Sequence, residues 1–97
     1  MVKHIVMWAL NEDAKKDSEK ITADLQNRFK SLLGVVDGLK AIEVGRNYNG
    51  GKYDLVLLCV FDSKEAQEKY QMHPAHVAIK EIVHSLTCGR ECADYEI

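Results

Sequence analysis

The chain has 97 residues, of which 46% are hydrophobic and 29% are charged, the balance of one ordinary globular domain. Its 13 basic and 15 acidic residues leave no basic surplus to neutralise phosphates, which argues against a nucleic-acid partner. The longest apolar run, residues 55–61, is far shorter than the roughly 20 residues that span a bilayer. We therefore expect a cytoplasmic protein of one domain, residues 1–97, with no membrane partner.

The first predicted element is a strand over residues 2–10, whose apolar side chains occupy both faces. One face carries Val2, His4, Val6, Trp8 and Leu10, and the other carries Ile5, Met7 and Ala9. Because both faces are apolar, we expect other structure to cover each side of this strand.

A long amphipathic helix is predicted next, because apolar side chains from Ile21 to Val36 recur at helical spacing. Asn11 or Asp13 can cap its start, and two glycines, Gly34 and Gly38, mark its exit.

The middle of the chain predicts a hairpin. Its strands are residues 40–46 and 53–61, and the turn-forming residues 47–52 join them. The second of these strands is apolar on both faces and is interrupted only by Asp54, which is typical of a central strand covered on both sides.

Two helical pieces and a last strand complete the chain. Ser63 is the predicted N-cap of a helix over residues 64–72, and Pro74 restarts a second helix that runs to Leu86. Residues 87–97 form the last strand, with a weaker pattern.

The order strand, helix, strand, strand, helix, strand predicts an α+β, ferredoxin-like βαββαβ domain, with a four-stranded antiparallel sheet and both helical layers on one face. The other face of the sheet then lacks a cover, although its two central strands are apolar there. Since no residues remain to cover it, we expect a second copy of the chain, giving a homodimer through the sheet face.

The cysteines and histidines do not form a recognised metal motif. Cys59 lies in an apolar run and is expected in the core. Cys88 and Cys92 are too far apart along one strand for a disulfide. The spacing His84-x3-Cys88-x3-Cys92 and the pair His73 and His76 lack the pattern of known zinc sites, so we predict no metal and no cofactor.

The best candidate for chemistry is the segment Tyr70-x2-His73-Pro74-Ala75-His76, at the break between the two helical pieces. His76 lies in the first turn of a helix, where the dipole disfavours a protonated ring, so it can act as a base. Tyr70 can donate a proton to a substrate oxygen, and His4 can add a polar contact. The alternative is structural: His73 caps the helix, Tyr70 packs in the core and His76 lies at its rim.

These residues resemble a known family, the stress-responsive dimeric α/β-barrel (Dabb) domain proteins. The resemblance covers essentially the whole chain and rests on three segments: Val2-Lys3-His4-Ile5-Val6; Gly45-Arg46-Asn47 with Gly51-Lys52-Tyr53-Asp54-Leu55; and Tyr70-x2-His73-Pro74-Ala75-His76-Val77. It implies a ferredoxin-like subunit whose sheet packs on that of a partner to form a dimeric α/β barrel.

A plant member of this family, olivetolic acid cyclase, implies a chemistry. It closes a linear polyketide by a cofactor-independent aldol reaction, with a Tyr and a His that match Tyr70 and His76 and a further His that matches His4. It also has a histidine where this chain has Leu55, so the resemblance does not imply the same substrate. Cofactor-independent monooxygenases of the same superfamily are related by fold alone.

We therefore expect a protein that binds a small, largely apolar molecule in a cleft between the second helical region and the sheet. His4, Trp8, Leu55 and His73 are the expected ligand contacts. The alternative is a cofactor-independent enzyme, with cyclase-like or monooxygenase-like chemistry, that uses the pair Tyr70 and His76.

Overall fold

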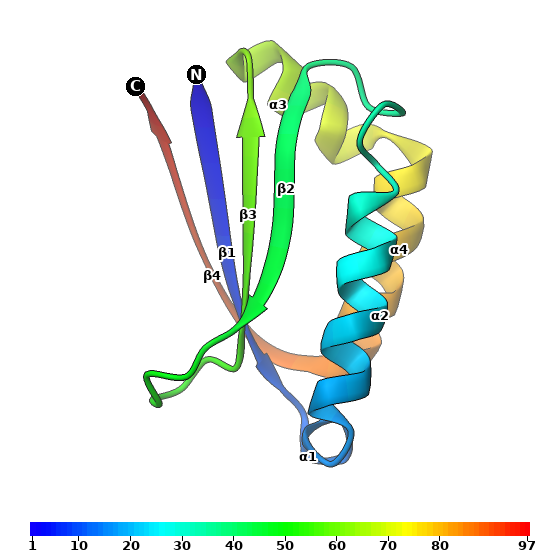
Figure 1. Ribbon diagram of the computed structural model, residues 1–97, viewed down its shortest axis with the longest axis vertical. Coiled ribbons are helices and arrows are strands. Elements are labelled where there is room, and N and C mark those ends of the chain that lie inside the picture. Colours follow the sequence, from blue (N-terminus) through cyan, green and yellow to red (C-terminus); the bar gives the residue numbers. More distant parts are fainter.

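The computed structural model describes residues 1–97 and contains four strands and four helices. In chain order they are β1 (Val2–Leu10), α1 (Glu12–Lys15), α2 (Ser18–Lys30), β2 (Leu39–Arg46), β3 (Leu55–Phe61), α3 (Lys64–Met72), α4 (Pro74–Leu86) and β4 (Thr87–Glu96). The strands form one antiparallel sheet in the order β2-β3-β1-β4, and α2, α3 and α4 lie on one side of it (Figure 1). The predicted ferredoxin-like α+β fold is confirmed.

Strand β1 lies in the middle of the sheet, between β3 and β4. Its register places His4 opposite Cys59 of β3 and opposite Asp94 of β4. Because side chains directly opposite one another in a sheet point to the same face, the side chains of Cys59 and Asp94 lie beside that of His4 on the helix side.

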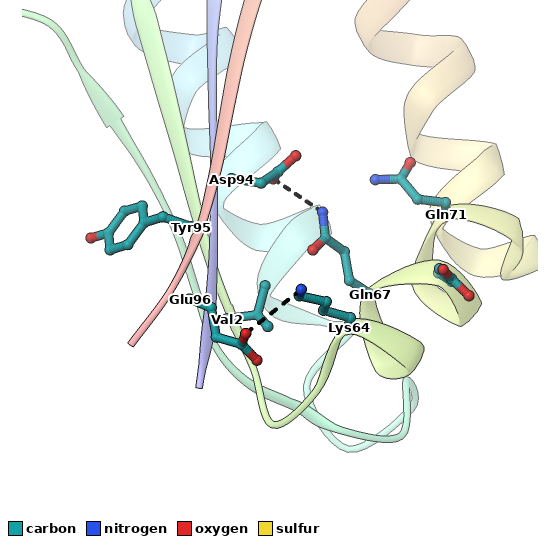
Figure 2. Close-up of a pocket in the computed structure, with 8 residues that line it drawn as sticks. Val2, Lys64, Gln67, Gln71, Asp94, Tyr95 and Glu96 are labelled. Carbon is teal, nitrogen blue, oxygen red and sulfur yellow. Dashed lines mark hydrogen bonds and ion pairs between the residues drawn. The ribbon is translucent and has the colours of Figure 1, made fainter.

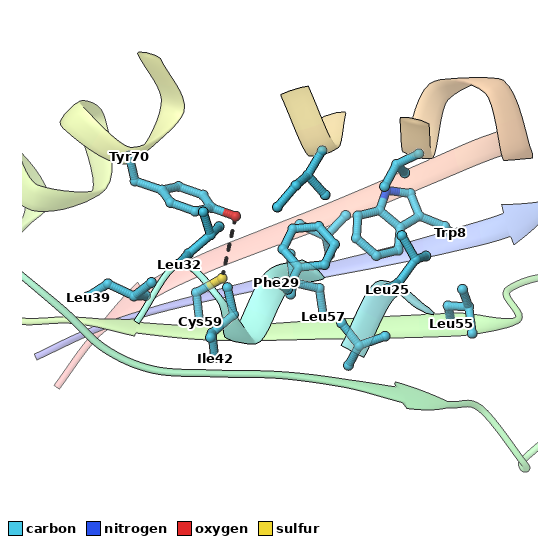
Figure 3. Close-up of a cluster of buried hydrophobic side chains, with 14 of the residues drawn as sticks. Trp8, Leu25, Phe29, Leu32, Leu39, Ile42, Leu55, Leu57, Cys59 and Tyr70 are labelled. Carbon is cyan, nitrogen blue, oxygen red and sulfur yellow. Dashed lines mark hydrogen bonds between the residues drawn. The ribbon is translucent and has the colours of Figure 1, made fainter. Parts of the chain in front are cut away.

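The core fills the space between the helices and the sheet (Figure 3). The face of β1 that begins with Val2 is buried as predicted, and Trp8 stacks on Phe29 of α2 with ring centroids 5.9 Å apart. Tyr70 of α3 is fully buried over β3, where it contacts Phe61 and Cys59. This packing fixes α3 close to the centre of the sheet.

The predicted single helix up to Val36 is wrong in its extent. A separate turn of helix, α1, comes first, and Asn11 rather than Asp13 caps it by accepting a hydrogen bond from the Ala14 amide at 2.9 Å. Helix α2 then ends at Lys30, and the chain continues in turns as far as Gly38. Leu32 and Val36 are nevertheless buried, because these turns keep both side chains on the core side.

Helices α3 and α4 begin and end where the sequence predicted. The Ser63 side chain caps α3 by accepting from the Ala66 amide, and Pro74 occupies the first turn of α4. Strand β3 begins at Leu55, two residues later than predicted. The preceding Asp54 instead uses its carboxylate to accept a hydrogen bond from the Leu10 amide at 2.7 Å.

The sheet face opposite the helices has no cover within the chain (Figure 1). Its central positions on β1 and β3 are apolar and half-buried: Ile5, Met7, Val56, Leu58 and Val60. No helix is long and apolar enough to cross a membrane.

Candidate functional site

A small inner cavity lies between the sheet and helices α3 and α4. Its volume is about 40 Å³, and its lining includes four of the side chains singled out from the sequence: His4 and Trp8 of β1, Tyr70 of α3 and His76 of α4. Three separate elements thus bring the expected residues together at one place. Basic side chains of α4 and β4, Lys80 and Arg90, line the same cavity.

Tyr70 contributes a flat wall to this cavity. Its ring stacks on that of His76, with centroids 3.9 Å apart and an interplanar angle of 27°. Its hydroxyl points to Cys59 on β3 and accepts a hydrogen bond from that thiol at 3.8 Å (Figure 3). Burial raises the pKa of Tyr70 well above its ordinary value and raises the pKa of Cys59 to about 12. Both groups therefore stay protonated at neutral pH, and the phenol can act only as a hydrogen-bond donor or acceptor.

His76 is a buried histidine with an unused nitrogen. The residue is 7% exposed, and its Nδ1 atom has no hydrogen-bond partner. Burial lowers the pKa of His76, and the positive charge of Lys80 adds to this effect. The ring is therefore neutral at pH 7 and can donate a hydrogen bond or accept one, according to its tautomer.

His4 is held by a partner that the sequence analysis missed. Its Nδ1 atom lies 2.5 Å from an oxygen of the Asp94 carboxylate. The amide of Gln67, on α3, lies 3.0 Å from the same oxygen and 3.3 Å from His4 Nδ1. A hydrogen bond from Nδ1 to a carboxylate fixes the ring and leaves Nε2 as the free nitrogen, the usual arrangement of a histidine that acts as a base.

A larger outer groove adjoins this pair, between α3 and the edge of the sheet (Figure 2). Its volume is about 420 Å³, and Asp94 and Gln67, joined by a hydrogen bond, line it. Gln71 lines both the groove and the inner cavity. The His4–Asp94 pair thus stands where the two spaces meet, with His4 on the inner side and Asp94 on the outer side.

Two of the expected ligand contacts lie elsewhere. His73 caps α4, because its Nδ1 accepts a hydrogen bond from the Ala75 amide at 3.1 Å. Leu55 is fully buried at the start of β3, toward the end of the sheet where β2 and β3 are connected. Neither residue lines the inner cavity.

The signal for Asp94 is present in the sequence but is weak. Arg90, Cys92 and Asp94 alternate along the last strand, so they share one face of it. The ferredoxin-like strand order pairs this strand with the first one, but the alternation does not give the register between them. The observed register places Asp94 opposite His4.

Comparisons with known proteins agree with the fold. A solved structure from Bacteroides fragilis, described as a dimeric protein of unknown function with a ferredoxin-like fold, is 31% identical with a TM-score of 0.87, over 99% of this chain and 95% of that chain. A solved structure from Arabidopsis thaliana is 26% identical with a TM-score of 0.85, over 100% and 95% of the two chains.

Sequence comparison gives the family. An uncharacterised Streptomyces coelicolor protein is 29% identical over 80 residues, which make up 80% of this chain and 81% of that protein. The model of the stress responsive A/B barrel domain, Dabb, matches residues 2–97. The chain therefore belongs to the stress-responsive A/B barrel domain family.

Proposed function

We propose that this Dabb domain binds a small, largely apolar molecule between the sheet and helices α3 and α4. One observation carries the proposal: His4, Trp8, Tyr70 and His76 converge on one cavity from three elements, and His76 Nδ1 is left without a protein partner. A buried polar atom of this kind is costly unless something satisfies it, and a ligand can do so. Half of the lining residues are hydrophobic, which suits an apolar body.

The charges of the cavity favour one kind of ligand. Lys80 and Arg90 line it, and neither forms an ion pair within the chain. An apolar molecule with one acidic or strongly hydrogen-bonding group would satisfy both the basic side chains and the histidine.

The size of the cavity sets a further condition. A volume of about 40 Å³ holds a few water molecules or a short polar group, whereas drug-sized ligands occupy roughly 300–1,000 Å³. The second helical region therefore moves away from the sheet as the ligand binds and enlarges this cavity. The adjoining groove of about 420 Å³ does not suit an apolar body, because most of its lining residues are polar or charged.

The same proposal includes self-association through the open sheet face. Five half-buried apolar residues of β1 and β3 support it, since no element of the chain covers them. The relative from Bacteroides fragilis is described as dimeric, which supports the same arrangement here. The helix side of the sheet, with the cavity, stays free in such a dimer.

The test is native mass spectrometry of the protein purified from its own host, compared with two cavity variants. We expect a bound molecule that is lost in His76→Gln and weakened in Tyr70→Phe, which removes only the hydroxyl. The matched control is His73→Asn, outside the cavity, because asparagine preserves the helix cap. An empty wild-type protein, or a ligand that survives His76→Gln, would contradict the proposal.

A second candidate function is a cofactor-independent enzyme that uses Tyr70 and His76. The observation that favours it is the His4–Asp94 pair, which supplies an oriented base at the edge of the same cavity. Mass spectrometry separates the two functions. If the protein is an enzyme, Tyr70→Phe slows the reaction and the variant retains unreacted substrate, whose mass differs from that of the molecule bound to the wild type. If it is a binding protein, the wild type and Tyr70→Phe hold a molecule of the same mass.

A further inference from the structure

We propose that His4, Cys92 and Asp94 form a binding site for a divalent transition metal ion of the zinc class. The ligand atoms of these three residues lie within 4.8 Å of one another. They come from the two ends of the chain, and only the pairing of β1 with β4 brings them together.

The spacing of the donor atoms suits tetrahedral coordination. Zinc binds nitrogen and oxygen at about 2.0–2.2 Å and sulfur at about 2.3 Å, which puts neighbouring ligand atoms about 3.4–3.6 Å apart in a tetrahedron. Cys92 Sγ lies 3.6 Å from His4 Nδ1 and 3.9 Å from Asp94 Oδ2. Only the distance from His4 Nδ1 to Asp94 Oδ1, 2.5 Å, is too short.

The short distance between His4 and Asp94 can increase, because the Asp94 side chain is free to move. His4 is fixed in the core, with 4% of its side chain exposed, whereas 47% of the Asp94 side chain is exposed. If the Asp94 carboxylate moves by about 1 Å, Oδ1 reaches the distance from His4 Nδ1 that two ligands of one tetrahedral metal ion have. This movement breaks the hydrogen bond between Asp94 and His4. The metal then takes the place of the Nδ1 proton, which moves to Nε2 of the same neutral ring, and the Cys92 thiol proton leaves to solvent.

The donor set selects the class of metal. One imidazole nitrogen, one thiolate sulfur and one carboxylate oxygen suit Zn²⁺, Co²⁺ or Ni²⁺, whereas Mg²⁺ and Ca²⁺ require oxygen ligands almost entirely. Three protein ligands with an open fourth position are typical of zinc sites that bind an exchangeable water or small ligand.

The fourth position is supplied from the outer groove. The Gln67 side chain already lies within 3.3 Å of His4 Nδ1 and 3.0 Å of Asp94 Oδ1, so its amide oxygen can turn toward the cation. Asp94 and Gln67 also line the groove of about 420 Å³, which gives a metal ion or a water molecule a path from solvent (Figure 2).

This inference goes beyond the proposed function and does not depend on it. Asp94 and Gln67 line the outer groove, whereas His76 and Tyr70 line the inner cavity, and neither His76 nor Tyr70 belongs to the proposed metal ligands. Loss of an organic ligand in His76→Gln therefore leaves metal binding intact, and failure of either proposal leaves the other standing.

The experiment is a titration of the tag-free, chelator-treated protein with Co²⁺, followed by competition with Zn²⁺. We expect one Co²⁺ per chain with a thiolate-to-cobalt absorption band, and Zn²⁺ should displace it. Cys92→Ser should remove this band and lower the affinity at least about 100-fold, because loss of a direct ligand exceeds the 10–100-fold cost of an outer-shell change. Asp94→Asn should lower the affinity at least about 10-fold.

The matched control is Cys88→Ser, four residues earlier on the same strand and also exposed. It should keep both the band and the affinity. Circular dichroism checks the fold of each variant, and both Cys92 and Asp94 are exposed, so their replacement should not unfold the chain. The proposal is overturned by the absence of saturable Co²⁺ binding, by binding that survives Cys92→Ser unchanged, or by equal loss of the band in Cys88→Ser.

Discussion

At the scale of single residues, the environment of His76 gives a prediction about pH. Its pKa in the folded protein is lowered by burial; the backbone groups of Gln71 and Tyr70 offset part of this effect, and the charges of Lys80 on the same helix and His4 on β1 add to it. Below the ordinary histidine pKa of about 6.5, the unfolded chain therefore binds a proton that the folded protein does not. The free energy of unfolding should fall as the pH drops through this range, by at most about 1.4 kcal/mol per pH unit for this one site.

Urea unfolding between pH 5 and pH 8 measures this effect. His76→Gln should flatten the pH dependence relative to the wild type, since the titrating ring is gone. The slopes are compared rather than the stabilities themselves, because the substitution also changes core packing. His84→Gln, which removes an exposed histidine of the same helix, is the control and should keep the wild-type slope. An unchanged slope in His76→Gln would mean that other groups cause the pH dependence.

At the scale of elements, the turn that leads into β2 gives a second prediction. Gly38 has a φ of +83°, and a Cβ atom there would lie 2.5 Å from Ala66 Cβ and 2.8 Å from Asp62 Oδ1. Gly34 has a similar φ of +84° but open space around its Cα. Gly38→Ala should therefore lower the free energy of unfolding by about 3 kcal/mol or more, through strain and overpacking, and Gly34→Ala by only about 1–2 kcal/mol. If chemical denaturation gives the same loss of unfolding free energy for Gly38→Ala and Gly34→Ala, the turn at Gly38 accommodates the extra methyl group without strain.

Most elements could be predicted from the sequence, because their signals are local. Ser63, Pro74 and the two-sided apolar run of β3 each act within a few residues. The end of α2 could not be predicted in this way, because Leu32 and Val36 are four residues apart and stay buried in turns as they would in a helix. Gly34, with its positive φ, lies between them in the region of turns that follows Lys30.

At the scale of the whole molecule, the candidate site could be predicted only in part. Tyr70 and His76 belong to one short segment, and the alternation of β1 placed His4 on the same side as Trp8. Asp94 is 90 residues away from His4, and its position depends on strand register. Leu55 is predicted as a ligand contact only because a relative has a histidine at this position. In the structure Leu55 is a fully buried core residue at the start of β3, outside the inner cavity.

The open sheet face gives the last prediction, which concerns the assembly. Leu58 lies at the centre of this face, opposite Ile5 of β1 and Glu43 of β2, and it is only half-buried within the chain. In a symmetric dimer formed by two such faces, a charge at this position is buried against an apolar surface without a partner of opposite charge. Light scattering should give about twice 11.0 kDa for the wild type and a monomer for Leu58→Asp. Leu33→Asp, at an exposed leucine in the turns after α2, should stay dimeric. A monomeric wild type, or a Leu58→Asp variant that remains a dimer, would place any self-association on another surface.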